Sequence, residues 1–244
     1  MKRVHEIYLD DSYRRENVAR VVTVKDGKYV VLDSTIFHPS SGGQPHDTGE
    51  MILIEEEEEV ARYRVVYVGR FGGLVSHEIE RIEADKREPV EGDLVRCLLD
   101  WDRRYKLMRS HTAAHLLSAI INRETGALIT GNQLDIEKVR IDFSLERFDR
   151  AQMEGFIEEA NEMIKQDLAV RHYYLPREEA EGITLLAKGL PKDLTELRIV
   201  EIEGIDRQAD GGTHVKRLGE IGRIELLKLE NKGKKNRRIY FKVV

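Results

Sequence analysis

The sequence has little cysteine and no long apolar run, and both absences restrict what the protein can be. Its single cysteine, Cys97, excludes an internal disulfide and fits a reducing compartment. No apolar run approaches the roughly 18 residues of a membrane-spanning helix. Residues 1–6 lack the hydrophobic segment of a signal peptide. We therefore expect a soluble, cytoplasmic protein that makes no membrane contact.

Charged residues are plentiful but unevenly distributed. The 244 residues are 41% hydrophobic and 35% charged, with a net charge of −5. Residues 211–244 contain ten Lys or Arg and three Glu, so this segment carries +7 and the first 210 residues carry −12. A basic segment on an acidic protein favours a polyanionic partner such as nucleic acid. The alternative is a hairpin whose exposed edge is protected by charged side chains.

Residues 1–98 have the pattern of a small β-barrel domain. Short β-rich runs are separated by turn signals such as the glycine pairs at 42–43 and 72–73. Closely spaced strands with few helices between them indicate a barrel. The five glutamates at 55–59 are interpreted as the solvated tip of a hairpin and not as a metal site. The β-rich runs are residues 20–24, 29–33, 51–54, 62–68 and 94–98.

Residues 99–244 mix helices with strands, which predicts an α+β domain with an antiparallel sheet. One helix is expected over residues 103–122, with Asp102 as its N-cap, and an amphipathic helix over 149–166. The whole chain is therefore assigned to the α+β class, as a small β-barrel followed by an α+β domain. Further strands are expected at 139–145, 169–174 and 196–206, with a closing hairpin formed by 223–230 and 237–244.

Two short motifs suggest a metal site. His111 and His115 are spaced i, i+4 within the first expected helix, so both imidazoles lie on one helix face. Asp210 and His214 stand in a Gly-rich turn after an expected strand. One such pair often occurs in an ordinary helix, but two favour a site of three nitrogens and one oxygen, which suits zinc, cobalt, nickel or iron. If Asp210 only orients a ligand, the three histidines leave an open position, as in catalytic zinc sites.

Longer motifs around these residues resemble the editing domain of alanyl-tRNA synthetase. Residues 206–215 (DRQADGGTHV), 219–222 (GEIG) and 231–239 (NKGKKNRRI) resemble its closing segment, and residues 110–117 (SHTAAHLL) resemble its first helix. Residues 37–49 (FHPSSGGQPHDTG) resemble the Gly-Gly-Gln loop of the barrel domain that precedes it. The order and spacing are similar to those of the freestanding AlaX family, in the medium-length form with both domains. No room remains for an ATP-binding synthetase core.

This resemblance implies a hydrolase that deacylates mischarged tRNA(Ala) in trans. The substrate would be chiefly Ser-tRNA(Ala), with Gly-tRNA(Ala) as a second candidate, while Ala-tRNA(Ala) is spared and no ATP is used. A synthetase pocket for alanine cannot strongly reject glycine or serine, so a second site must destroy the wrong product. One zinc ion per chain would be held by His111, His115 and His214, with Asp210 in the position where the family usually has cysteine. A carboxylate is a harder ligand than a thiolate, which leaves the affinity and identity of the metal open.

The resemblance also implies roles for four further residues. Thr130 would bind the serine hydroxyl, or it is an ordinary threonine in a turn or at a strand start. The backbone N–H groups of Gly211 and Gly212 would approach the ester oxygen during catalysis. Alternatively, the two glycines only form a tight turn that needs a positive φ. Gln44 is interpreted as a contact between domains or to the end of the substrate.

Seven basic residues are expected to contact tRNA phosphates, although cross-strand partners should claim some of them. No aromatic-rich strand of the base-stacking type is apparent, so we expect recognition through RNA shape and backbone. The seven are Lys216, Arg217, Lys232, Lys234, Lys235, Arg237 and Arg238.

Two other functions stay open at this point. A metal-dependent esterase or amidase for a small substrate would act on serine esters without tRNA, but the basic C-terminal segment argues against it. A non-catalytic tRNA-binding module with a decayed metal site would bind RNA without turnover, but the complete set of three histidines argues against that. The oligomeric state is unknown.

Overall fold

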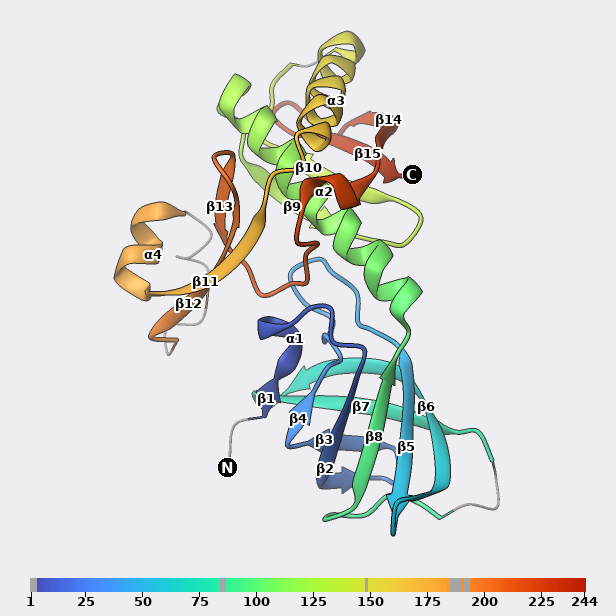
Figure 1. Ribbon diagram of the computed structural model, residues 1–244. Helices are drawn as coiled ribbons and strands as arrows, with labels where there is room; N and C mark the ends of the chain where they lie inside the picture. The colour runs from blue at the N-terminus through green and yellow to red at the C-terminus, as the bar shows by residue number, and fades with distance from the viewer. Residues whose placement is uncertain (1–3, 84–86, 148, 185–189, 191–193) are drawn as a thin grey trace. The chain divides into compact units, whose positions relative to one another are not determined.

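The chain forms two compact units, Met1–Tyr105 and Lys106–Val244, in a computed structural model (Figure 1). The structure describes residues 4–83, 87–147, 149–184, 190 and 194–244. A closed barrel in the first unit and helices with antiparallel sheets in the second confirm the predicted α+β class. The predicted domain boundary between residues 98 and 99 stays a prediction. Within the described ranges, no helix combines the length and the apolar character needed to cross a bilayer.

The first unit is built around a closed antiparallel barrel of six strands in the order β2-β3-β7-β6-β5-β8. Alternate side chains point inward, as in β2, where Asn17, Ala19 and Val21 are buried between exposed neighbours. A two-stranded parallel pair, β1 (His5–Glu6) with β4 (Ser34–Thr35), and the short α1 (Ile7–Asp10) complete the unit. The barrel strands are β2 (Glu16–Lys25), β3 (Tyr29–Leu32), β5 (Gly49–Glu55), β6 (Glu58–Phe71), β7 (Leu74–Arg81) and β8 (Leu94–Leu99).

The barrel contains the five expected strands and one that the sequence pattern did not reveal, β7. Its buried positions include Ser76 and His77, so polar residues conceal the alternation expected of a half-buried strand. The imidazole of His77 is satisfied inside the barrel, where Nδ1 lies 2.9 Å from the carbonyl of Val30 and Nε2 lies 2.8 Å from the hydroxyl of Thr35. The five glutamates form the tip of the β5–β6 hairpin, as predicted.

Helix α2 (Trp101–Thr125) carries the first histidine motif and is longer than expected at both ends. Its first turn is capped by Asp100, whose Oδ1 accepts a hydrogen bond from the N–H of Arg103 at 3.2 Å. Asp102 lies inside the first turn, so the prediction that Asp102 is the N-cap is wrong. Both aspartates precede a helical pattern, and only the backbone conformation decides which of them is the cap.

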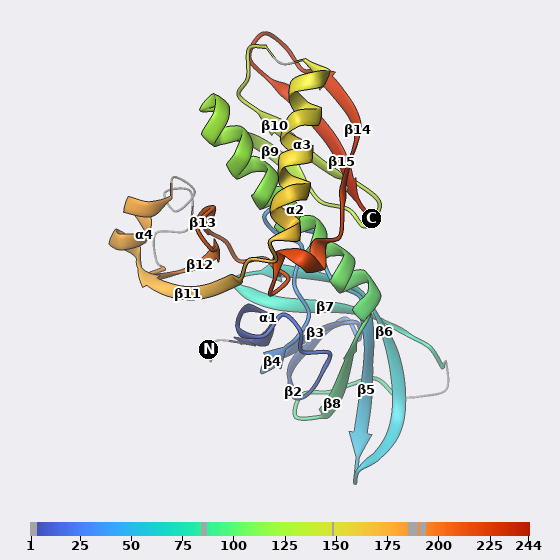
Figure 2. The same ribbon diagram turned by 45° about the horizontal axis from the view of Figure 1, so that its top comes forward.

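The second unit contains a four-stranded antiparallel sheet with the order β14-β15-β10-β9. Helix α3 (Arg150–Lys165) begins after its N-cap Asp149 and packs on this sheet (Figure 2). The Asn161 side chain of α3 bonds both the N–H and the carbonyl of Ile224. The expected closing hairpin is present as β14 and β15. The strands are β9 (Ile129–Gln133), β10 (Val139–Phe143), β14 (Ile224–Asn231) and β15 (Arg237–Val243).

A separate three-stranded antiparallel sheet has the order β11-β12-β13. The single strand predicted over residues 196–206 is instead β12 (Glu196–Ile202) and the first residue of β13 (Asp206–Ala209), with Gly204 at φ +72° in the turn between them. Helix α4 (Arg177–Ile183) follows β11 (Val170–Pro176) and was not expected, because seven residues are too few to show a helical period. The 3-10 helix η2 (Leu218–Ile221) leads to β14.

Candidate metal centre

The four predicted metal ligands lie together in the second unit. Helix α2 presents His111 and His115 from successive turns, and the loop after β13 presents Asp210 and His214. One ligand atom from each residue lies within 4.8 Å of the others. The rings of His111 and His214 are nearly stacked, with centroids 4.2 Å apart. The i, i+4 spacing on a helix and the short loop therefore converge on one point.

The carboxylate of Asp210 is at the centre of this group. Its Oδ1 lies 3.1 Å from Nε2 of His214, while Oδ2 lies 3.5 Å from Nε2 of His111 and 3.7 Å from Nε2 of His115. The three imidazole side chains are at most 10% exposed, and the Asp210 side chain is 18% exposed. The centre is thus largely buried, and the Asp210 carboxylate is its most exposed group.

The orientation of His214 is fixed by Thr112, a residue that sequence reasoning did not identify. The Thr112 hydroxyl donates to the carbonyl of Met108 at 3.0 Å, and it has only one proton to give. It must therefore accept a hydrogen bond from Nδ1–H of His214, 3.1 Å away. This tautomer leaves the lone pair of Nε2 directed at Asp210.

His115 is oriented in the same way by Asp206, which the sequence analysis included only as the first residue of a motif. Nδ1 of His115 donates to Oδ2 of Asp206 at 3.0 Å, so Nε2 faces the centre. A carboxylate behind a ligating imidazole is a recurrent feature of metal sites. Burial alone would lower the pKa of His115, but Asp206 and Asp210 outweigh burial and raise that pKa to about 10. A cation bound at Nε2 would displace this proton.

The donor set fits a divalent cation. Burial lowers the pKa of His214 to about 4, so its Nε2 carries no proton at neutral pH. Burial alone would raise the pKa of Asp210, but the neighbouring histidines hold it well below its usual range. Two proton-free acceptors 3.1 Å apart in a buried site repel each other unless a positive charge lies between them. Three nitrogens and one oxygen around that position are a common zinc ligand set.

The loop that carries Asp210 is held by Arg198 of β12. This arginine is 8% exposed, and its Nη1 donates to the carbonyls of Asp210 at 2.9 Å and Gly212 at 3.1 Å. The N–H of Asp210 donates in turn to the carbonyl of Arg198. A charged residue within a predicted strand suggests a solvent-facing position, so only the structure reveals this contact.

The two loop glycines differ in their surroundings. The N–H of Gly212 donates to Oδ1 of Asp210 at 2.6 Å, so this group orients the carboxylate. Gly211 is exposed, and a methyl group added to it would meet no atom within 4 Å. Neither residue has a positive φ, so the alternative interpretation of a left-handed turn is wrong. Their contact with the ester oxygen stays a prediction.

Thr130 is exposed on β9, the strand at one edge of the four-stranded sheet. Its hydroxyl donates to the side-chain oxygen of Asn236 at 3.0 Å. The interpretation as a threonine at a strand start agrees with its place as the second residue of β9. Recognition of a serine hydroxyl by Thr130 stays a prediction.

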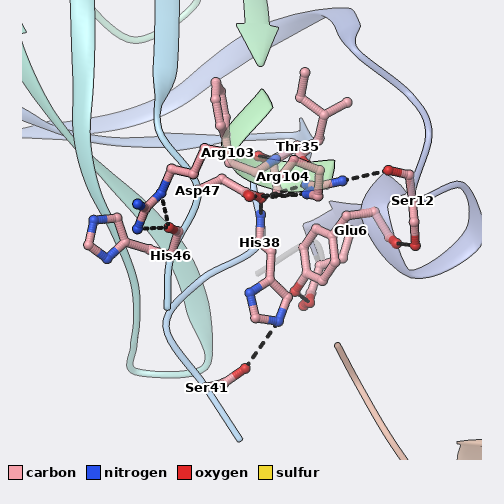
Figure 3. A network of polar contacts seen from close by, with 12 residues as sticks. Glu6, Ser12, Thr35, His38, Ser41, His46, Asp47, Arg103 and Arg104 are labelled. Atoms are coloured by element: carbon pink, nitrogen blue, oxygen red, sulfur yellow. Dashed lines mark hydrogen bonds and ion pairs between the residues drawn. The ribbon is translucent and has the colours of Figure 1, made fainter. Parts of the chain in front are cut away.

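Gln44 belongs to a loop of the first unit that a buried ion pair anchors to the start of α2 (Figure 3). Arg104 is fully buried, and its Nε donates to Oδ1 of Asp47 at 3.0 Å. Oδ2 of Asp47 accepts the N–H of His38 at 2.6 Å. Gln44 itself is 1% exposed, and its backbone pairs with Ser41. Its contact with another domain or with the substrate stays a prediction.

Several of the seven basic residues are paired within the protein, as the sequence analysis anticipated. Arg238 forms two hydrogen bonds, of 2.6 and 2.8 Å, with its cross-strand partner Asp142. Arg237 bonds backbone and side-chain groups of its own hairpin and the carbonyl of Glu146. Lys234 is exposed and forms no ion pair with any residue that the structure describes. The other pairs are Arg217 with Asp167, Lys232 with Glu230, and Lys235 with Glu146.

Comparisons with known proteins agree with one another. Residues 197–240 match the family of the threonyl and alanyl tRNA synthetase second additional domain, and residues 6–103 match class II (A) tRNA synthetases. The alanyl-tRNA editing protein AlaX-M of Methanosarcina acetivorans is 50% identical over 240 residues, covering 96% of this chain and 97% of the relative. AlaX-M of Saccharolobus solfataricus is 44% identical and covers 98% of both chains. The alanine–tRNA ligase of Pyrobaculum neutrophilum is 40% identical over 94% of this chain, which is only 26% of the ligase.

Proposed function

The chain belongs to the AlaX-M family of alanyl-tRNA editing proteins, and from this membership we propose that it hydrolyses Ser-tRNA(Ala) in trans and spares Ala-tRNA(Ala). It is an aminoacyl-tRNA deacylase, a carboxylic ester hydrolase. The observation that carries the proposal is the convergence of His111 and His115 with Asp210 and His214 on one buried point. Glycine attached to the same tRNA is a second candidate substrate.

The residues of the centre would hold one divalent cation per chain, which we propose to be zinc. Thr112 and Asp206 keep the Nε2 atoms of His214 and His115 directed at it. Gly212 and Arg198 keep the Asp210 carboxylate in place as the fourth ligand. A cation bound there supplies a Lewis acid that polarises the ester carbonyl. The exposed Gly211 offers its backbone N–H to the ester oxygen.

Selectivity for serine requires a group that alanine cannot satisfy. We propose that the Thr130 hydroxyl pairs with the hydroxyl of the substrate serine. The Thr130 hydroxyl gives its proton to Asn236, so it would accept a hydrogen bond from the serine. Once bound substrate covers Thr130, leaving its oxygen without that bond costs roughly 1–3 kcal/mol, which would give about a tenfold or larger preference over alanine. The exposed basic side chains, Lys234 among them, bind the phosphates of tRNA(Ala).

The proposal is tested by the release of labelled amino acid from Ser-tRNA(Ala), Gly-tRNA(Ala) and Ala-tRNA(Ala). We expect fast loss of serine, little loss of alanine, loss of activity on chelation and recovery with zinc. His111→Ala should abolish hydrolysis, because it removes a ligand, and Thr130→Val should reduce the preference for serine over alanine about tenfold.

Three other results of these assays would contradict different parts of the proposal. Serine release that persists after verified metal removal would contradict the metal mechanism and leave the function intact. Hydrolysis of serine methyl ester as fast as that of Ser-tRNA(Ala) would indicate an esterase for small substrates. Tight binding of tRNA without hydrolysis of any of the three would overturn the proposed activity.

A further inference from the structure

The sheet β11-β12-β13 has two chemically different faces. One face packs against α4 through an apolar cluster that contains Ala180, Leu197, Ile199 and Ala209, with Tyr173 packed against it. Because side chains alternate along a strand, the residues between these belong to the opposite face. Figure 2 shows α4 beside β11 and β12.

The opposite face carries the carboxylates of the metal centre. Residues that pair directly across an antiparallel sheet point to the same side. Tyr174 pairs with Arg198, whose carbonyl accepts the N–H of Asp210. In the same register, Ile202 pairs with Asp206, the residue that orients His115. The face opposite α4 is therefore the one on which the metal centre is built.

Two aromatic side chains of β11 lie on this face. Tyr174 is 46% exposed, and His172, two residues earlier, is exposed as well. They stand two strands away from β13, about 10 Å at the usual spacing of strands. Along β11, His172 and Tyr174 alternate with Tyr173 and Leu175, which face α4. Because aromatic residues occur on both faces, the sequence does not show which of them are exposed.

The backbone of an exposed lysine adjoins the start of β11. The N–H of Val170, the first residue of β11, donates to the carbonyl of Lys216 at 2.8 Å. Lys216 follows the ligand His214 by two residues and is exposed. Exposed aromatic rings next to a cation are the elements that bind unpaired nucleotides, through base stacking and phosphate contact.

We propose that Tyr174 and His172 form a stacking site for the 3′-terminal adenine of the tRNA, which holds the aminoacylated ribose at the metal centre. This inference rests on the proposed function, because it takes the esterified end of a tRNA as the ligand. The terminal adenine is attached to the esterified ribose, so it is the base nearest to the scissile bond. A ring about two strands from the ligands can therefore hold it while the ester reaches them. Base stacking at this site would act in addition to the expected recognition of RNA shape and backbone.

The test measures binding of two uncharged acceptor-stem RNA hairpins, one ending in CCA and the other lacking the terminal adenosine. In the wild-type protein the terminal adenosine should strengthen binding. Tyr174→Leu should weaken binding of the complete hairpin about tenfold, because it removes one stacked ring, and should not change binding of the shortened one. Tyr174→Phe keeps the ring face and should behave as wild type. His172→Ala is the second variant and should also affect only the complete hairpin.

The same variants separate this inference from the proposed function. With Ser-tRNA(Ala), Tyr174→Leu should raise KM about tenfold and leave kcat and the bound metal unchanged. Equal weakening of both hairpins by Tyr174→Leu, or of neither, would overturn the stacking site even if serine is released normally. If the wild-type protein releases no serine, the proposed function fails, but the hairpin comparison still decides whether Tyr174 contacts the adenine.

Discussion

At the scale of single residues, the candidate metal centre depends on side chains that are not among its four predicted ligands. Thr112 and Asp206 fix which ring nitrogen of His214 and His115 faces Asp210. An imidazole without such a partner can rotate or change its tautomer, which weakens its binding of a cation. The centre is therefore already arranged for a cation by the hydrogen bonds behind it.

Asp206 offers a direct test of this arrangement. Asp206→Asn keeps the size of the side chain but removes the charge behind His115, so zinc affinity should fall about 10- to 100-fold. The affinity is measured by competition with a chromophoric chelator. Asp167→Asn, which removes an exposed carboxylate bonded to Arg217, is the control and should bind zinc as wild type does. Unchanged affinity in the Asp206 variant would refute the role assigned to this residue.

The cluster of His111, His115, Asp210 and His214 could be predicted from the sequence, whereas the residues that orient these side chains could not. The spacing of His111 and His115 places both rings on one helix face whatever the rest of the fold does. The role of Thr112 depends on a hydrogen bond to Met108 in the previous turn and on a loop a hundred residues away. From the sequence, Arg198 is likewise expected at the surface, and only the structure shows that it donates to the carbonyl of Asp210.

At the scale of elements, the barrel strand β7 is unusual because it buries a histidine. Only the neutral imidazole of His77 can form both of its hydrogen bonds. In that form Nδ1–H donates to the carbonyl of Val30, and Nε2 accepts from the hydroxyl of Thr35. Burial lowers the pKa of His77 to about 4. The unfolded chain binds a proton near the ordinary value of about 6.5.

This difference predicts an acid-sensitive barrel. Between pH 6.5 and pH 4, only the unfolded chain binds a proton at this histidine. The contribution of His77 to the free energy of unfolding is therefore constant above pH 6.5 and decreases as the pH falls toward 4. The loss is at most about 3 kcal/mol. Urea unfolding of wild type and His77→Asn, followed through the single tryptophan Trp101, measures it at pH 7 and pH 4.5. The wild type should lose more stability than the variant, and equal losses would contradict the prediction.

Elements with a regular pattern could be predicted, and those with mixed faces could not. The closing hairpin and α3 were expected because their apolar residues repeat with the period of the element. β7 was missed, because the polar residues Ser76 and His77 occupy buried positions that the period assigns to apolar side chains. The strand expected over residues 169–174 is present as β11, Val170–Pro176.

At the scale of the whole molecule, the basic C-terminal segment is less free than its charge of +7 suggests. Arg238 and Arg217 form ion pairs within the protein, and Arg237 donates to the carbonyl of Glu146. Composition reports formal charge, and only the fold reveals which charges have partners. The contribution of each basic residue to RNA binding must therefore differ.

Alanine variants of Lys234 and Arg238 compare an exposed basic residue with an ion-paired one. Lys234→Ala should weaken tRNA binding and reduce the slope of log affinity against log salt by about 0.7–0.9, as for one lost phosphate contact. Arg238→Ala should mainly lower the thermal midpoint of unfolding, because it leaves Asp142 without its cross-strand partner. Fluorescence titrations at three salt concentrations and thermal melts distinguish the two effects. An unchanged slope in the Lys234 variant would exclude it from the interface.

The two halves of the metal centre come from segments about a hundred residues apart, α2 and the loop after β13. An ion bound by both halves would act as a removable cross-link between the beginning and the end of the second unit. Such an ion binds only the finished fold and stabilises it in proportion to its own affinity. If the proposed ion is bound, its uptake would also mark the end of synthesis, because a nascent chain that has not yet extended past His214 would lack half of the ligands.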